Sequence, residues 1–144
     1  MLQITIVDDS PGDTADLRAC LARWEKETGT PIRVTEYANA LDFLEEYRGA
    51  CDILLLDVDM PGINGMDAAR QLRAVDQAVR IMFVTNMAQF AIAGYEVDAT
   101  DFIVKPVRYF SFAQKLSRTA ALAVRRRQWH LLLRAGDDLI RLPV

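Results

Sequence analysis

The 144 residues, 51% hydrophobic and 26% charged, are typical of one soluble globular domain with at most a small appendage. The formal net charge of −3 argues against direct nucleic-acid binding by this stretch of chain, because such binding needs a basic surface. No apolar run approaches membrane-spanning length, and the first apolar segment begins at Leu2. We therefore expect a cytoplasmic protein with no signal peptide and no membrane partner.

Apolar segments of strand length alternate along the chain with segments that have the 3.6-residue period of helices. Strands are predicted at residues 2–7, 32–37, 53–56, 81–84 and 102–104. Helices are predicted at residues 11–28, 39–48, 65–73, around 90–95, and at 107–126, where Phe112, Leu116 and Val124 are expected to face inward. Parallel strands need crossovers that are right-handed and usually helical, so the alternation predicts a doubly wound α/β fold.

The predicted sheet has five parallel strands covered by helices on both faces. Its third strand, at residues 53–56, is wholly apolar, as expected for a strand that is buried on both sides. We favour the strand order 2-1-3-4-5 of flavodoxin-like and CheY-like proteins, whose switch point lies between the first and third strands. This order places Asp8 and Asp9 beside Asp57.

The last residues follow a different pattern. Two apolar runs, at 129–133 and 139–142, flank a turn at Gly136, Asp137 and Asp138, which is typical of a β-hairpin. We interpret residues 127–144 as a linker and the incomplete start of a second domain, with a hairpin docked on the first domain as the alternative. His130 has no partner at helical spacing, so we expect it to be structural.

Polar side chains follow four of the predicted strands, at the point where each strand ends. They are Asp8 and Asp9 after the first strand, Asp57 after the third, Thr85 after the fourth and Lys105 after the fifth. Each residue alone has an ordinary explanation, such as a turn cap, a strand terminus or a solvated lysine. Because the carboxyl ends of parallel strands share one edge of the sheet, the four ends together predict a functional site.

The residue types at this edge suit phosphoryl transfer. Clustered carboxylates repel one another, and oxygen ligands completed by water suit Mg²⁺, which would relieve the repulsion. Asp57 is then a candidate nucleophile, since carboxylates form aspartyl phosphates. The Lys105 ammonium and the metal would neutralise the transferred group, and the Thr85 hydroxyl would donate a hydrogen bond to it.

Four motifs resemble the receiver domain of two-component response regulators. They are Val7-Asp8-Asp9-Ser10, Leu56-Asp57-Val58-Asp59-Met60-Pro61-Gly62, Val84-Thr85-Asn86 and Val104-Lys105-Pro106. The resemblance covers residues 2–126, which we take as the receiver domain. It implies a signalling phosphoacceptor rather than an enzyme, with Asp57 accepting a phosphoryl group from a sensor histidine kinase.

The same resemblance implies a metal site and a contact set. Mg²⁺ would be bound by Asp9 and Asp57 with the backbone carbonyl of Asp59, and Asp8 would support them. Thr85 and Lys105 would contact the phosphoryl group, and the Lys105-Pro106 bond would be cis.

The places of Thr85 and Phe102 on neighbouring predicted strands lead to the hypothesis of a switch. Thr85 would move toward the phosphoryl group, and Phe102, which stands where many receivers have Tyr, would rotate inward to fill the vacated volume. The altered surface of the fourth helix, fifth strand and fifth helix would then pair with a second copy, giving a homodimer.

Residues 85–102 resemble receivers of the LytTR subfamily of transcription regulators, and residues 129–144 are similar to the first strands of their DNA-binding domain. This finer resemblance implies that the receiver controls transcription. It also implies that DNA is bound only through a C-terminal domain that this sequence does not contain.

Two other functions fit parts of the sequence. Asp57 and Asp59 have the spacing of a haloacid-dehalogenase-type phosphatase, with Asp57 as nucleophile and Asp59 as acid/base. Such an enzyme would need an acidic pair after Lys105, which is missing, and would leave Asp8 and Asp9 without a role. A binding module that is never phosphorylated is the third possibility, and retention of the whole residue set argues against it.

Overall fold

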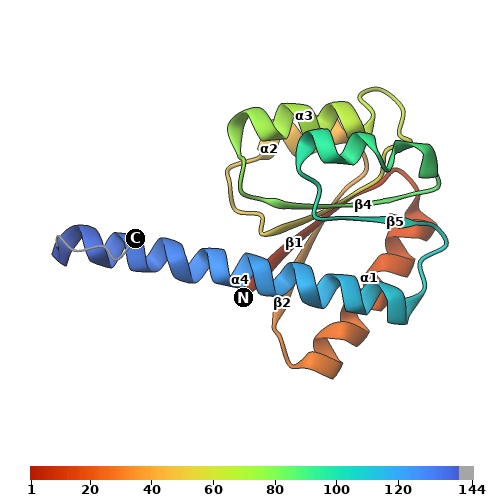
Figure 1. The fold of residues 1–144 in the computed structure, drawn as a ribbon. Coiled ribbons are helices and arrows are strands. Elements are labelled where there is room, and N and C mark those ends of the chain that lie inside the picture. The colour runs from red at the N-terminus through yellow and green to blue at the C-terminus, as the bar shows by residue number, and fades with distance from the viewer. Residues whose placement is uncertain (140–144) are drawn as a thin grey trace.

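The computed structural model describes residues 1–139, which form one sheet and its covering helices (Figure 1). The elements are β1 (Leu2–Val7), α1 (Pro11–Thr28), β2 (Ile32–Tyr37), α2 (Ala40–Glu46), β3 (Ile53–Leu56), α3 (Gly65–Val75), β4 (Arg80–Thr85), the 3₁₀ helices η1 (Ala88–Phe90) and η2 (Ala93–Val97), β5 (Asp101–Val104) and α4 (Tyr109–Leu139). Within these residues no helix combines the length and apolar character that crossing a membrane requires.

The five strands form a parallel sheet in the order β2-β1-β3-β4-β5, which confirms the predicted topology. Val7 of β1 lies beside Leu56 of β3, and Leu56 lies beside Phe83 of β4. Two residues further along β4, Thr85 lies beside Val104 of β5 at the same edge. The carboxyl ends of β1, β3, β4 and β5 therefore meet, and the polar residues that follow them share one edge.

The sheet separates two apolar cores because successive side chains of a strand point to opposite faces. Helices α1 and α4 cover one face, and α2, α3 and the η segments cover the other (Figure 1). The first core joins Leu21, Phe112 and Leu116 to alternate residues of the strands, and the second joins Met66 and Leu72 to the intervening ones. All four residues of β3 are buried, as its wholly apolar sequence predicted.

Side-chain caps define where the helices begin beside the site. The Ser10 hydroxyl accepts a hydrogen bond from the backbone N–H of Asp13 at the start of α1, and Asn64 caps α3 through the N–H of Asp67. Helix α1 ends at Gly29, whose φ of 72° lies in the left-handed region that glycine adopts without strain. These local signals fix the helices that follow β1 and β3.

The predicted C-terminal β-hairpin is wrong where the structure describes it. Helix α4 continues without a break to Leu139, so residues 129–139 are helical, and residues 140–144 lie outside the described part. Short apolar runs do not distinguish strand from helix, and an isolated two-stranded hairpin is marginal in water. A helix satisfies its backbone hydrogen bonds locally, so continuing α4 needs no partner strand.

Two details of the predicted helices also differ. The segment expected to be a fourth α-helix forms η1 and η2, with hydrogen bonds from Phe90 N to Met87 O and from Tyr95 N to Ile92 O. In α4, Phe112 and Leu116 are buried as expected, but Val124 is 39% exposed and Ala123 is buried instead. The buried stripe continues at the 3.6-residue period from Leu116, which selects Ala123.

Candidate functional site

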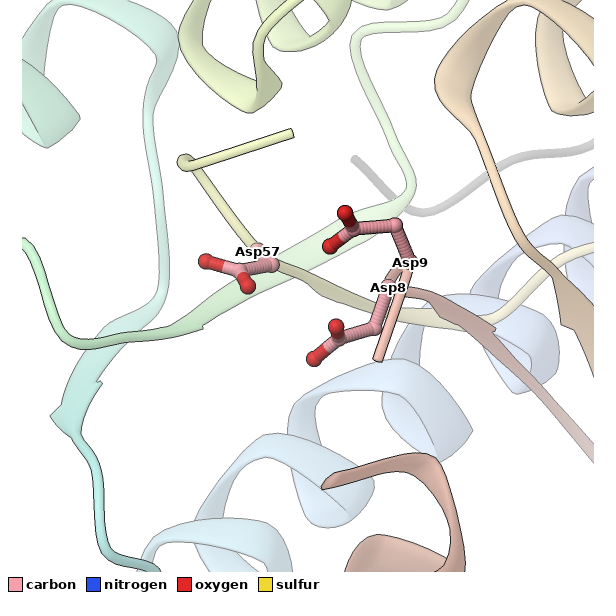
Figure 2. A group of neighbouring side chains, drawn as sticks. All are labelled: Asp8, Asp9 and Asp57. Carbon is pink, nitrogen blue, oxygen red and sulfur yellow. The ribbon is translucent and has the colours of Figure 1, made fainter. Parts of the chain in front are cut away.

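Three carboxylates gather at the carboxyl edge of the sheet. The backbone places them, because Asp8 N donates to Tyr37 O and Asp57 N donates to Val7 O. Carboxylate oxygens of Asp8, Asp9 and Asp57 all lie within 4.8 Å of one another. Figure 2 shows the three side chains leaving the ends of β1 and β3 toward the same side. Asp8 and Asp57 are buried and Asp9 is exposed, so the group opens to solvent through Asp9.

Lys105 binds two of these carboxylates and a third one from α1. Its Nζ lies 2.8 Å from Asp8 Oδ2 and 3.0 Å from Asp57 Oδ2. A third partner, Asp13 Oδ2 in the first turn of α1, lies 2.7 Å away. Burial lowers the pKa of Lys105, but the hydrogen bonds to these carboxylates outweigh it and raise the pKa above its usual value, so the ammonium stays charged.

The surroundings of Asp8 disfavour the charged form of its carboxyl group. Burial raises the pKa of its carboxyl, and the bonds from Lys105 and from the Ser10 N–H offset only part of that rise. The repulsion from Asp57 acts in the same direction as burial. A cation bound beside these residues would relieve both effects, and their oxygen atoms are the ligands that Mg²⁺ prefers.

The loop after β3 holds the Asp57 carboxylate by its backbone. Asp59 N donates to Asp57 Oδ1 at 3.1 Å, and Gly65 N donates to Val58 O at 2.9 Å. A Cβ on Gly65 would stand 2.0 Å from Asp57 O, so only glycine fits there. The Asp59 side chain is exposed and is not part of the carboxylate group found among the described residues, so its observed link to Asp57 is through the backbone.

Thr85 and Phe102 lie on β4 and β5, next to the carboxylates in the order of strands. Thr85 is fully buried, and its hydroxyl accepts a hydrogen bond from Met87 N at 3.1 Å, in the turn that leads to η1. The Phe102 ring packs against Phe83, with 5.8 Å between ring centroids, on the side of the sheet covered by η2. The Lys105-Pro106 bond is cis, as the resemblance implied.

Asp13 is the site residue that sequence reasoning missed, because the pattern of residues 11–28 predicts only a helix there. The signal is present in the sequence, since α1 starts at Pro11, two residues after Asp9, and its first turn must lie over the same edge. The structure thus brings together Asp8, Asp9, Asp57 and Lys105, and adds Asp13 to them.

The comparison with protein families agrees with this geometry. Residues 4–117 match the family model described as the response regulator receiver domain. The match spans most of the chain and includes the whole carboxylate edge. The chain therefore belongs to the response regulator receiver domain family.

Individual relatives show the same relationship. An uncharacterized response regulatory protein of Yersinia pestis is 33% identical over 135 residues, covering 93% of this chain and 55% of the relative. The sensory transduction protein LytT of Bacillus subtilis is 35% identical over 109 residues, covering 74% of this chain and 43% of LytT. The chain spans about half the length of these curated relatives.

Among solved structures, the response regulator StyR is 25% identical with a TM-score of 0.80, and the match covers 96% of this chain and 68% of the StyR chain.

Proposed function

We propose that Asp57 is the phosphoacceptor of this receiver domain and that a sensor histidine kinase is its phosphodonor. The observation that carries the proposal is the binding of one buried ammonium, Lys105, to both Asp8 and Asp57, with the exposed Asp9 beside them. A nucleophile, a fixed cation and an opening to solvent are the parts that phosphoryl transfer needs.

In the proposed reaction a carboxylate oxygen of Asp57 attacks phosphorus, and the bond between phosphorus and the donor's leaving group breaks. The N–H of Asp59 and the ammonium of Lys105 hold the two Asp57 oxygens, so the carboxylate is oriented before the donor arrives. After transfer, Lys105 neutralises a phosphoryl oxygen, and the Thr85 hydroxyl turns from Met87 N to donate to another.

The carboxylates are suited to Mg²⁺, which supplies positive charge to the transferring group when it is bound. Asp9 and Asp57 would be direct ligands together with the backbone carbonyl of Asp59, and Asp8 would act as a supporting acid. Asp9→Ala should lose most Mg²⁺ affinity while staying folded, since Asp9 is exposed and its loss leaves no buried cavity. Isothermal titration of Mg²⁺ measures this, and an unchanged affinity would remove Asp9 from the site.

A surface for a homodimer is also part of the proposal. Ile92, which precedes η2, and Tyr95 of η2 are 81% and 82% exposed, and Val104 of β5 is 48% exposed. Such exposed apolar side chains are suited to pairing with a second copy. Movement of Thr85 toward the phosphoryl group and of Phe102 into the vacated space would change this surface, which includes η1–η2, β5 and α4.

The output that we infer is control of transcription by a LytTR-type regulator. Support comes from the likeness of residues 85–102 to that subfamily and from LytT among the relatives, with 35% identity over 109 residues. DNA would be bound through a further domain. Residues 127–139 belong to α4, so in this proposal they are a helical connection from the receiver.

The test of the phosphoacceptor is labelling with acetyl phosphate and Mg²⁺. We expect one acid-stable, base-labile phosphoryl group on Asp57, and none on Asp57→Asn, because an amide is a poor nucleophile. Rapid phosphate release over many turnovers that is lost in Asp59→Asn would instead support the phosphatase. Absence of labelling in the wild type would support a binding module that is never phosphorylated.

The test of the switch is self-association with and without beryllofluoride, a phosphoryl mimic. Coupling between two binding equilibria is reciprocal. The mimic should therefore raise the affinity of self-association by the same factor by which dimerisation raises the affinity for the mimic. In Thr85→Ala the gain should be lost. Equal gains in both proteins would exclude Thr85 as the relay.

A further inference from the structure

The Asp13 carboxylate has a role other than capping its helix. Ser10 and Asp13 have the three-residue spacing of a capping box, in which each side chain would bind the backbone N–H of the other. Only half of that exchange is present: Ser10 Oγ accepts from Asp13 N at 3.3 Å, whereas Ser10 N donates to Asp8 Oδ1 at 2.9 Å. The Asp13 carboxylate is therefore not used by the cap, and it binds Lys105 instead.

The ammonium of Lys105 has no donor left for a further acceptor. An ammonium carries three N–H donors, and Nζ has three carboxylate partners at 2.7, 2.8 and 3.0 Å. A phosphoryl group on Asp57 needs the same ammonium. Phosphorylation removes the negative charge of the Asp57 carboxyl itself, so Asp8 and Asp13 are the two carboxylates that keep their charge and compete with the phosphoryl group for Lys105. Asp13 is the partner that water can solvate after release, because its side chain is 37% exposed whereas those of Asp8 and Asp57 are 2% and 6% exposed.

We propose that Asp13 is a positioning residue that competes with the phosphoryl group for Lys105. In the resting protein Asp13 occupies one N–H of the ammonium, and the phosphoryl group has to displace it from that donor. Competition of this kind favours the unphosphorylated state, since forming the Lys105–phosphoryl bond costs the Lys105–Asp13 bond. The proposal rests on the proposed function, because it requires Asp57 to carry the phosphoryl group.

The effect of Asp13 on the affinity for anions should differ from its effect on the affinity for metal. Among the described residues the group able to hold a metal is formed by Asp8, Asp9 and Asp57, and Asp13 is outside it. Removing the Asp13 charge frees Lys105 for an anion, but it also removes a negative charge near the cation. The affinity for a phosphoryl mimic should therefore rise while the affinity for Mg²⁺ falls or stays unchanged. General loosening of the site would weaken both.

The experiment is titration of beryllofluoride at saturating Mg²⁺ into the wild type, Asp13→Asn and Asp13→Glu. Asparagine keeps the shape of the side chain without its charge, so we expect affinity to rise on the order of tenfold, as for the loss of one competing charge-assisted hydrogen bond. Glutamate keeps the competing charge and should stay near the wild type. Asp13→Ser, a second neutral variant, should behave like Asp13→Asn.

The matched control is Asp16→Asn, which removes an exposed carboxylate from the same helix one turn further along. Its affinity for beryllofluoride should equal that of the wild type. An equal gain in Asp16→Asn, or unchanged or weaker binding by both neutral Asp13 variants, would overturn the competition. Failure of the proposed function itself looks different: the wild type would not bind beryllofluoride, or Asp57→Asn would bind it equally well.

Discussion

Helix α1 and the η1–η2 segment both follow strands that end at the carboxyl edge, yet they are held very differently. Helix α1 has a Ser10 side-chain cap, a left-handed glycine at its end and four buried residues facing the sheet. Neither η1 nor η2 has a side-chain cap, and only Gly94 and Val97 are buried. The carboxylates are thus placed by the firmly held side of the site, and the segment after Thr85 is the one that can rearrange at low cost.

The placement of the carboxylates can be disturbed most directly at Gly65, the first residue of α3, which follows β3. In Gly65→Ala the new Cβ would overlap the Asp57 backbone, standing 2.0 Å from its carbonyl oxygen. We expect a loss of about 3 kcal/mol or more in the free energy of unfolding, measured by urea denaturation, because neither backbone can move freely. Mg²⁺ affinity should fall with it, since Asp57 is displaced.

The control for this substitution is Gly12→Ala, in the first turn of α1. Its Cβ would have Ser10 Oγ as its nearest neighbour at 4.0 Å, so no overlap arises. The helix should gain up to about 1 kcal/mol from the better helix former. Equal losses in the free energy of unfolding of the two variants would mean that overlap with the Asp57 backbone is not the reason why Gly65→Ala is destabilising.

Hydrogen exchange compares the two regions without mutation. Amides of η1 and η2 should exchange at least about tenfold faster than the central amides of α1, because uncapped short turns open locally. Beryllofluoride with Mg²⁺ should raise protection in the η segments and leave α1 nearly unchanged. Equal protection in both regions of the free protein would remove the contrast between a firm and a responsive side.

The smallest expected effects are at the two helix ends that adopt a left-handed backbone. Gly29 after α1 has φ 72° and Asp98 after η2 has φ 53°. Gly29→Ala should lower the free energy of unfolding by about 1 kcal/mol, and Asp98→Gly should raise it by a similar amount. Thermal denaturation of both variants measures the pair. A loss of stability in Asp98→Gly would show that the Asp98 side chain contributes more than its backbone costs.

Most of the correct predictions came from the pattern of the strands in the sequence. The strand order, the shared edge and the approach of Asp8, Asp9, Asp57 and Lys105 follow from apolar runs that end in polar residues, because a parallel sheet aligns those ends. Roles for the individual side chains stay predictions until labelling and titration test them.

The predictions that were wrong or missing concern segments whose local sequence pattern fits more than one structure. Residues 129–139 have apolar runs that suit strand or helix, and continuing α4 satisfied the backbone locally. Residues 88–90 and 93–97 form two short 3₁₀ helices, of which η2 packs against α3, and the apolar period of such a short segment does not distinguish this geometry from an α-helix. Asp13 looked like an ordinary helix-opening acid, and only the three-dimensional placement of Lys105 shows which atom it contacts.

The length of α4 has a mechanical consequence. Its 31 residues make a rod of about 46 Å, and the last buried residue of α4 that the structure describes is Ala123. Beyond it the helix leaves the sheet (Figure 1) and extends about 24 Å further to Leu139. Lys115 donates to the carbonyl of Phe102, so the near arm of this rod is joined to β5. A tilt of a few degrees at that joint would be multiplied along the free arm, so that a small rotation of the helix near the sheet would displace its far tip by ångströms.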